Sequence, residues 1–564
     1  MNKNNIRSFG IVVACIIVLN IVSAYAFFRL DLTSEKRYSI SENTKKLMSR
    51  LDKDKKMHIR IYLDGDLNPG FLRLKKSVGE MLDEFKIYAD NDFTYEFVNP
   101  STASSQEERD KAYATLEKRG MKASVVYDKD DEGKAIQKVV FPWAEIYYEH
   151  DTIPVNLLEN NPRFSGSQNL NNSIENLEFQ LTDAIRVKTT KTINKVAFIE
   201  GHGEYPAELV YDASVAFSRY FQVDRGQLGT DPNVLKAYKA IVIANPQKPF
   251  TEQEKYIIDQ YVMNGGRVLW LVNGVRLAED SLSTVGVSPA IPLNVNLDDQ
   301  LFKYGARIEP VLLQDMQCTQ VPMNVARPGE AAKFEPMPWY YAPLLLASPE
   351  HPITRNLVEI RGTFASALDL NVSSSTKIKK TVLLVTSNAT HAEMTPTRID
   401  LSTMYNMDSK TYFNTGYAPV AAALEGQFAS VFANRMIPDG IISDGKTITE
   451  SKPTRMIVVS NADIIRNEVE GSGPAMQFLP LGYDRYTKQE YGNHDFILNS
   501  ILYLADDDGW LQLRSREFKL RLLNKKVVVS GKKKWEIINV ALPIVILLAF
   551  AFGYSAFRRK YYTR

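Results

Sequence analysis

The turn Gly201-His202-Gly203-Glu204 carries the residue types best suited to chemistry in this chain of 564 residues. It directly follows the apolar run at 196–199, which we expect to be a buried strand. An imidazole and a carboxylate two residues apart could act as an acid/base pair or bind a metal ion. Because open α/β sheets bind ligands at the carboxyl ends of their strands, the turn is our candidate ligand or interface site.

A structural interpretation of the same turn needs no chemistry. The two glycines allow a tight turn, the polar side chains of His202 and Glu204 then hold it, and the sequence offers no third partner. We favour this interpretation, and we therefore predict no catalytic residue, no cofactor and no metal ion. The protein is predicted not to be an enzyme.

Residues 440–447, GIISDGKT, match the phosphate-binding pattern G-x4-G-K-[ST]. That pattern binds phosphate only when a strand precedes it and a helix follows it. Pro438 and Asp439 stand before the match and Pro453 follows it, so neither flank fits. We interpret the match as chance and do not expect the chain to hydrolyse ATP.

Composition excludes several further classes of function. The patterns G-x-S-x-G, H-E-x-x-H and G-x-G-x-x-G are absent, and the two cysteines, Cys15 and Cys318, form no Cys-x-x-Cys motif. Thiol redox chemistry is therefore not expected. A net charge of +2 lacks the strongly basic character of nucleic-acid-binding proteins, so no nucleic-acid partner is predicted.

The periodicity of apolar residues predicts an α/β fold in two layers. In the first, strand-like and helix-like segments follow the order β-α-β-α-β-β, which is typical of a thioredoxin-like layer. The capping-box pattern Asn172-Ser173-Ile174-Glu175 predicts the start of a connecting helix.

The second layer contains continuous apolar strands at 196–199, 240–244, 268–272, 381–386 and 455–460. Such strands, alternating with helices, predict a doubly wound parallel sheet covered on both faces. The Pro-rich stretch 291–343 is expected to be loops or an insertion. At Val272-Asn273-Gly274-Val275 the amidotransferase type of this fold has a nucleophilic cysteine, and its absence predicts a non-catalytic domain.

The uncharged run from Ile537 to Phe557 is long enough to cross a membrane as a helix. Basic clusters flank it on both sides, which argues against a buried core helix. A second uncharged run extends from Gly10 to Phe28. With Lys3 and Arg7 before it, this run could be a signal peptide cleaved after Ala24-Tyr25-Ala26, but its length favours a retained anchor.

Basic residues in both short tails favour keeping the two termini in the cytoplasm. The large domain between the spans is then periplasmic, and the localisation is the inner membrane, in contact with membrane lipid. The predicted segments, in order, are a cytoplasmic tail (1–9), a transmembrane helix (10–28), an N-terminal α/β domain (29–170), a connecting helix (171–192), a Rossmann-like α/β domain with a Pro-rich insertion (193–510), a basic juxtamembrane segment (511–535), a transmembrane helix (536–557) and a cytoplasmic tail (558–564).

Several segments occur in a fixed order along the chain, namely Arg29-Leu30-Asp31-Leu32-Thr33, Lys36-Arg37-Tyr38-Ser39-Ile40-Ser41, Gly201-His202-Gly203-Glu204, Asn264-Gly265-Gly266-Arg267-Val268, Pro419-Val420-Ala421 with Leu424-Glu425-Gly426, and Gly492-Asn493 through Phe496 and Asn499 to Asp506. Their order resembles the GldG family of gliding-motility-associated ABC transporter components. The likeness covers nearly the whole chain, including the two anchors.

The resemblance implies a partner of a membrane permease and a separate cytoplasmic ATPase in a Bacteroidota-type gliding apparatus. It also implies that the middle domain is shared with an intraflagellar-transport subunit, a non-enzymatic assembly module. We therefore expect a non-enzymatic, substrate-binding-like auxiliary subunit of an ABC transporter. The alternatives are a membrane-anchored hydrolase, or a solute or glycan receptor, that uses the turn from Gly201 to Glu204.

Overall fold

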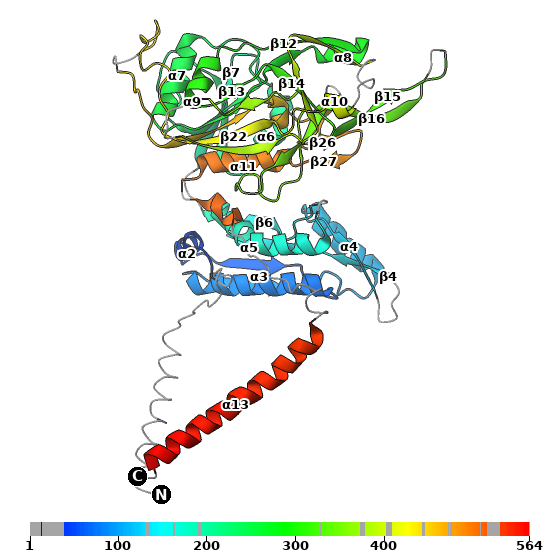
Figure 1. Ribbon diagram of the computed structural model, residues 1–564, viewed down its shortest axis with the longest axis vertical. Helices are drawn as coiled ribbons and strands as arrows, with labels where there is room; N and C mark the ends of the chain where they lie inside the picture. Colours follow the sequence, from blue (N-terminus) through cyan, green and yellow to red (C-terminus); the bar gives the residue numbers. More distant parts are fainter. Residues whose placement is uncertain are drawn as a thin grey trace. The chain divides into compact units, whose positions relative to one another are not determined.

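The computed structural model describes Val13 and residues 39–129, 135–149, 151–161, 164–189, 193–326, 329–372, 378–401, 409–442, 446–471, 473, 476–507, 509–515 and 531–562. The chain divides into two units (Figure 1). One, which we call the body, is Tyr38–Arg516. The other combines the two chain ends, Met1–Arg37 and Glu517–Arg564.

A small mixed sheet forms the N-terminal part of the body. Its strand order is β2-β1-β5-β6, and β1 runs parallel to β2 and antiparallel to β5. The strands are β1 (Met57–Ile61), β2 (Phe93–Phe97), β5 (Trp143–Tyr148) and β6 (Asp151–Asn156), with the separate hairpin β3 (Ser124–Lys129) and β4 (Ala135–Val140). The α/β prediction is confirmed here, and the thioredoxin-like assignment stays a prediction.

Helices pack on one face of this small sheet. They are α2 (Glu42–Ser49), α3 (Pro69–Tyr88) and α5 (Gly166–Thr189). Leu74, Leu82 and Leu181 contribute to the buried cluster that the helices share with the strands. Leu116 of α4 (Gln106–Lys118) packs in a separate buried cluster with Tyr62 and Phe141. The capping-box prediction at Asn172 is wrong, because α5 already begins at Gly166.

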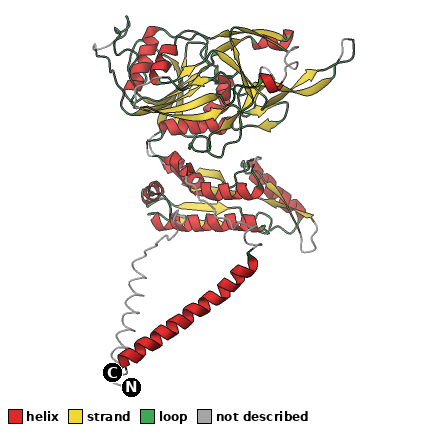
Figure 2. Ribbon diagram, in the orientation of Figure 1, coloured by secondary structure: helices red, strands yellow, loops and turns green. Residues whose placement is uncertain are grey.

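The C-terminal part of the body is built on a ten-stranded sheet with a parallel core (Figure 2). The core strands lie in the order β8-β7-β9-β10-β23 and all run in the same direction. They are β7 (Asn194–Glu200), β8 (Phe221–Gln227), β9 (Tyr238–Ala244), β10 (Val268–Leu271) and β23 (Thr454–Val459).

Antiparallel strands extend this sheet beyond β23, so the prediction of a purely parallel sheet is corrected to a mixed one. In order they are β22 (Pro419–Gly426), β19 (Ile378–Val385), β16 (Phe334–Ala347), which also pairs with β17 (Ile360–Arg361), and β15 (Cys318–Asn324). All of these neighbours pair antiparallel, and long connections separate them in the sequence except in the β15–β16 hairpin.

The stretch 291–343 is more ordered than we predicted. It contains α9 (Asp298–Tyr304), β13 (Arg307–Ile308), β14 (Val311–Asp315), β15 and most of β16. Proline is tolerated because Pro322 and Pro336 lie in the β15–β16 hairpin, at the edge of the large sheet. The remaining strands form small accessory sheets, which are β11 (Val275–Leu277) with β12 (Val287–Pro292) and β21 (Thr397–Asp400), β13 with β18 (Leu368–Asp369), β14 with β20 (Thr390–Met394), β24 (Val469–Glu470) with β25 (Gln477–Phe478), and β26 (Tyr483–Asp484) with β27 (Gln489–Glu490).

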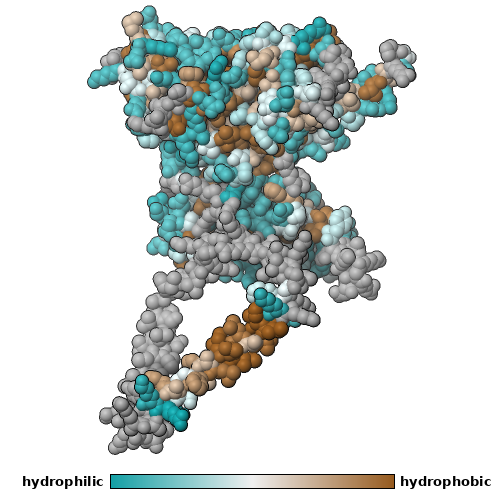
Figure 3. Space-filling model, in the orientation of Figure 1, coloured by the Kyte–Doolittle hydropathy of each residue, from teal (hydrophilic) through white to brown (hydrophobic). Residues whose placement is uncertain are grey.

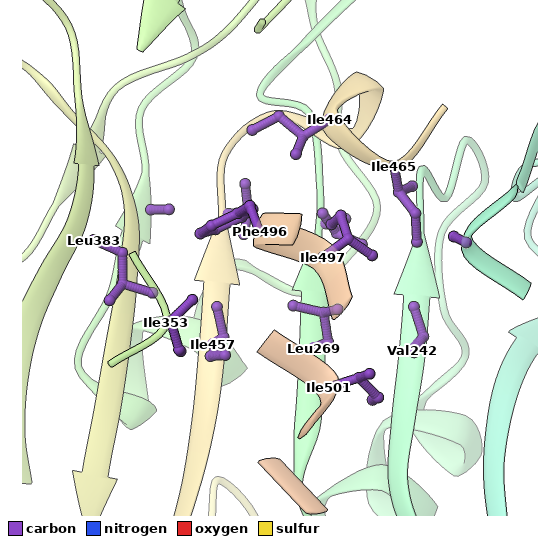
Figure 4. Close-up of a cluster of buried hydrophobic side chains, with 14 of the residues drawn as sticks. Val242, Leu269, Ile353, Leu383, Ile457, Ile464, Ile465, Phe496, Ile497 and Ile501 are labelled. Carbon is purple, nitrogen blue, oxygen red and sulfur yellow. The ribbon is translucent and has the colours of Figure 1, made fainter. Parts of the chain in front are cut away.

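Both faces of the parallel core are buried. Helices α6 (Tyr211–Ser218) and α11 (Asn493–Ala505) pack on one face, where Phe496 and Ile497 meet Leu269 (Figure 4). Helices α7 (Glu252–Met263) and α9 pack on the other, where Trp270 lies. The prediction of a sheet covered on both sides is confirmed.

A long apolar helix, α13 (Lys532–Tyr562), belongs to the unit formed by the chain ends. Its segment Lys534–Lys560 is long and apolar enough to cross a membrane, and it is the one such helix among the described residues. Figure 3 shows its continuous hydrophobic surface. The predicted anchor from Ile537 to Phe557 lies within it, whereas the predicted span from Gly10 to Phe28 lies outside the described residues, apart from Val13.

Replacing Phe496 by alanine should destabilise the body by about 3–5 kcal/mol, because the ring is fully buried between α11 and the sheet. The measurement is the midpoint of chemical unfolding of the full-length protein, followed by intrinsic fluorescence. Phe334→Ala is the matched control, since that ring is 65% exposed, and should cost less than about 0.5 kcal/mol. Equal losses for both variants would contradict this assignment of the core.

Candidate functional site

The order of the parallel strands places the Gly201 turn at a reversal point. After β7 the chain forms β8 on one side of it, and then crosses back to form β9, β10 and β23 on the other side. In open α/β sheets the crevice at such a reversal, outside the carboxyl ends of the strands, is the usual ligand site. The turn directly follows β7, as predicted from the sequence, while its role as a ligand or interface site stays a prediction.

The backbone of the turn depends on its glycines. Gly201 and Gly203 have φ values of 121° and 78°, which residues with a side chain rarely adopt. The carbonyl of His202 accepts hydrogen bonds from the amides of Gln247 (2.7 Å) and Lys248 (2.8 Å), which follow β9. The turn after β7 is thereby joined to the loop after β9, across the reversal point.

The His202 side chain lies inside the protein, and only 4% of the residue is exposed. Its Nδ1 is 3.1 Å from Oε1 of Glu204, and its Nε2 is 3.1 Å from Oε2 of Glu254. The ring stacks on Phe250, with 3.6 Å between ring centroids. Two carboxylates and one aromatic ring therefore surround the imidazole.

The charge state of His202 follows from these contacts. Burial lowers the pKa of His202, but hydrogen bonds and attraction to the Glu204 and Glu254 carboxylates outweigh burial, so the pKa is raised above its ordinary value. The same pairing, added to hydrogen bonds from Thr251, outweighs burial at Glu254 and lowers the pKa of that carboxyl. The raised pKa favours the imidazolium, in which both ring nitrogens donate; this form is a poor proton acceptor and has no lone pair for a metal ion.

Sequence reasoning paired His202 with Glu204 and missed Glu254 and Phe250. Glu254 lies in the first turn of α7, where it forms a capping box with Thr251. The sequence signal was available in the order T-E-Q-E at 251–254, which predicts a helix start with an inward-reaching glutamate. What the sequence did not reveal is that this helix begins beside the turn at 201–204.

Amide side chains form hydrogen bonds at the ends of the neighbouring strands. Oδ1 of Asn245 accepts hydrogen bonds from Gln247 Nε2 (2.7 Å) and Asn273 Nδ2 (3.1 Å). Oδ1 of Asn273 accepts one from the backbone amide of Ala462 (2.7 Å), which follows β23. The carboxyl ends of β9, β10 and β23 are thus linked by one chain of amide hydrogen bonds.

Other candidate groups have structural surroundings. Around the phosphate-loop match, the described residues are loop and turn, with neither the preceding strand nor the following helix, so the chance interpretation is confirmed for them. Burial, and then the nearby Asp315, raise the pKa of the Cys318 thiol to about 12, which leaves it unreactive as a nucleophile at neutral pH. Among the residues that the structure describes, no group of three or more His, Cys, Asp or Glu side chains could hold a metal ion.

Comparison with known proteins identifies two family matches. Residues 194–500, more than half of the chain, match a family described as an ABC-type uncharacterized transport system. Residues 34–147 match a domain of unknown function, DUF7088. No curated protein matches the chain. Among solved structures, the mmIFT52 N-terminal domain matches the chain with 12% sequence identity and a TM-score of 0.31. The match covers 56% of this chain and 99% of that domain.

The His202 cluster predicts a pH dependence of stability. Because the folded pKa of His202 is raised, its stabilising contribution is fully present below about pH 6, under the unfolded value near 6.5, and is lost as pH rises through the folded value. The thermal midpoint of His202→Gln should therefore fall further below that of the unmodified protein at about pH 6 than at about pH 8.5.

Glu254→Gln serves as the companion variant, because removing one of the two carboxylates should reduce the same pH dependence. A stability difference between His202→Gln and the unmodified protein that stays constant across this pH range would contradict the imidazolium assignment.

Proposed function

The chain belongs to the family of auxiliary components of ABC-type uncharacterized transport systems, and from that premise we propose that it is a non-enzymatic subunit that links a membrane permease to an α/β body. Its partners lie within an ABC transport system. The finer assignment names a permease and a separate cytoplasmic ATPase as those partners, with the body in the periplasm and both termini in the cytoplasm.

The enclosed His202 is the observation that carries the non-enzymatic part of the proposal. Both ring nitrogens face carboxylates 3.1 Å away, and the ring is covered by Phe250. A general base or a nucleophile-activating histidine needs a nitrogen within reach of substrate. The turn with the residue types best suited to catalysis instead joins the end of β7 to the first turn of α7.

The anchoring part of the proposal is supported by α13. Its uncharged run from Ile537 to Phe557 spans about 30 Å at a rise of 1.5 Å per residue, which matches the hydrocarbon thickness of a bilayer. Its basic ends, including Arg558, Arg559 and Lys560, are typical of residues at a membrane surface. A helix of this kind is suited to pack against the spans of a permease.

Contacts at the two ends of the body support a mechanical role. Near its start, the Glu178 carboxylate on α5 accepts hydrogen bonds from the amide of Ser41 (2.6 Å) and the hydroxyl of Thr44 (2.7 Å). Near its end, the guanidinium of Arg186 on α5 lies 5.6 Å from the ring centroid of Trp510. Both ends of the body thus contact α5, so movement of either anchor would reach the same helix.

The link to gliding motility is part of the proposal and rests on the order of motifs that resembles the GldG family. That resemblance also supports a Bacteroidota-type apparatus as the setting. The hydrolase alternative loses support because His202 and Glu204 are enclosed by their own neighbours. The receptor alternative at the same turn loses support for the same reason.

Isolation of the full-length protein from its native membrane in mild detergent should recover a polytopic permease and an ATPase, identified by mass spectrometry. A chain truncated after residue 530, which lacks α13, should lose most of this recovery, since the proposal places permease contacts on the anchors. Recovery of the full-length protein alone, in several detergents, would contradict the auxiliary-subunit assignment.

The double variant His202→Gln with Glu204→Gln separates the structural role from a hydrolytic one. We expect it to co-isolate with the same partners and to support the same cellular function, at a lower thermal midpoint, because the contacts that it removes hold the turn. Complete loss of function in a variant that folds, inserts and assembles normally would favour the hydrolase.

A further inference from the structure

A cavity of about 500 Å³ lies at the carboxyl end of β10, on the same edge of the parallel core as the Gly201 turn. Val272, Asn273 and Gly274 line one side of it, and the loop at 292–297 and helix α9 line the other. Its volume falls in the range of about 300 to 1,000 Å³ that is typical of small-molecule sites. We call it the β10 pocket.

A close backbone approach fixes one wall of the β10 pocket. A side chain at Gly274 would place its Cβ only 2.6 Å from the carbonyl oxygen of Glu309 and 2.7 Å from Oγ of Ser366. Only glycine permits this contact, which holds the chain leaving β10 against the segment that carries Ile308 and Pro310. Both of those residues line the pocket, so the wall is set by the fold.

The lining combines an apolar base with a polar rim. Leu293, Val295, Leu297 and Leu301 are all buried, and they supply apolar surface. Phe302 stands at the rim with 48% of its surface exposed, although it follows directly after a buried position of α9. An exposed aromatic ring beside a cavity offers a flat apolar surface to a ligand.

Four polar side chains complete the rim, namely Asn294, Asp298, Asp299 and Arg307, and Arg307 Nε lies 3.6 Å from Oε1 of Glu309. Of these, Asp299 is already paired, at 2.8 Å, with both Lys255 Nζ and Arg435 Nη1. Partial burial, and then the charge of Asp299, raise the pKa of Asp298, against the attraction of Arg307 and Lys255. The rim therefore presents carboxylate, amide and guanidinium groups, with both signs of charge.

We propose that the β10 pocket binds a neutral, hydroxyl-rich solute of about one or two sugar rings. A hydroxyl both donates and accepts hydrogen bonds, so it can pair with Asp298, Asn294 and Arg307 alike. The adjacent carboxylates disfavour an anion, and Arg307 disfavours a simple cation. The C–H face of a sugar ring would lie against Phe302. This inference goes beyond the proposed function, which names no solute.

The test uses the purified full-length protein in lipid nanodiscs, because many detergents carry sugar headgroups that would compete. D-glucose, N-acetyl-D-glucosamine and cellobiose are titrated to millimolar concentrations by isothermal titration calorimetry. We expect at least one to bind and to raise the thermal midpoint of the body, since a ligand that binds only the native state stabilises it.

Phe302→Ala and Asp298→Asn should each weaken that binding about tenfold or more. Both residues are exposed, so the variants should fold, and an unchanged thermal midpoint without ligand checks this. Phe334→Ala, which removes an exposed ring on β16, is the control that should bind normally.

Three outcomes would overturn the proposal. One is the absence of binding by all three saccharides, and another is binding that both pocket variants leave unchanged. The third is binding of glycine or glycylglycine in their place, because a zwitterion would use Asp298 and Arg307 as separate ion pairs. Since these assays need no partner subunit, their failure would leave the recovery of a permease and an ATPase standing as a separate result.

Discussion

Burial of the parallel core on both faces is the constraint on which the rest of the body depends. Parallel strands need crossover connections, and these cover both faces of the sheet with helices. All four residues of β10 are fully buried, with Leu269 facing α11 and Trp270 facing α7 and α9. Because both faces are covered, loops and any bound ligand must lie at the ends of the strands.

The carboxyl edge must then satisfy its own polar groups, since buried donors and acceptors without partners are costly. At β7 this is achieved by His202 between two carboxylates, and at β9 and β10 by Asn245 and Asn273. The polar groups of this edge are therefore directed at one another. The β10 pocket lies beside Gly274, where the chain leaves β10.

Much of this architecture could be predicted from continuous apolar runs. Strands β7, β9, β10, β19 and β23 have apolar runs that were read correctly, because a strand buried on both faces leaves an unbroken signal in the sequence. Strand β22 was missed, since PVAAALEG is rich in alanine, which has low strand propensity. Residues 291–343 were misjudged because their prolines lie on an edge hairpin, where no neighbouring strand needs the missing amide.

The candidate site shows the limit of local patterns more sharply. His202 and Glu204 are neighbours in sequence and were paired correctly, but Glu254 reaches the same ring from α7, fifty residues later. The β10 pocket combines Gly274 with Arg307 through a backbone contact that no periodicity encodes. Contacts between distant parts of the chain, and not residue type, decide which polar side chains are paired inside the protein and which face the pocket.

The two ends of the parallel core therefore have different tasks in our interpretation. Helix α5, which contacts both ends of the body, precedes β7 and so adjoins the amino end of the core. The β10 pocket lies at the opposite, carboxyl end. The strands between these two ends are packed on both faces, and β7 is joined to α7 through His202 and Glu254. Packed elements of this kind shift as units, so a displacement at one end of the core would be carried to the other.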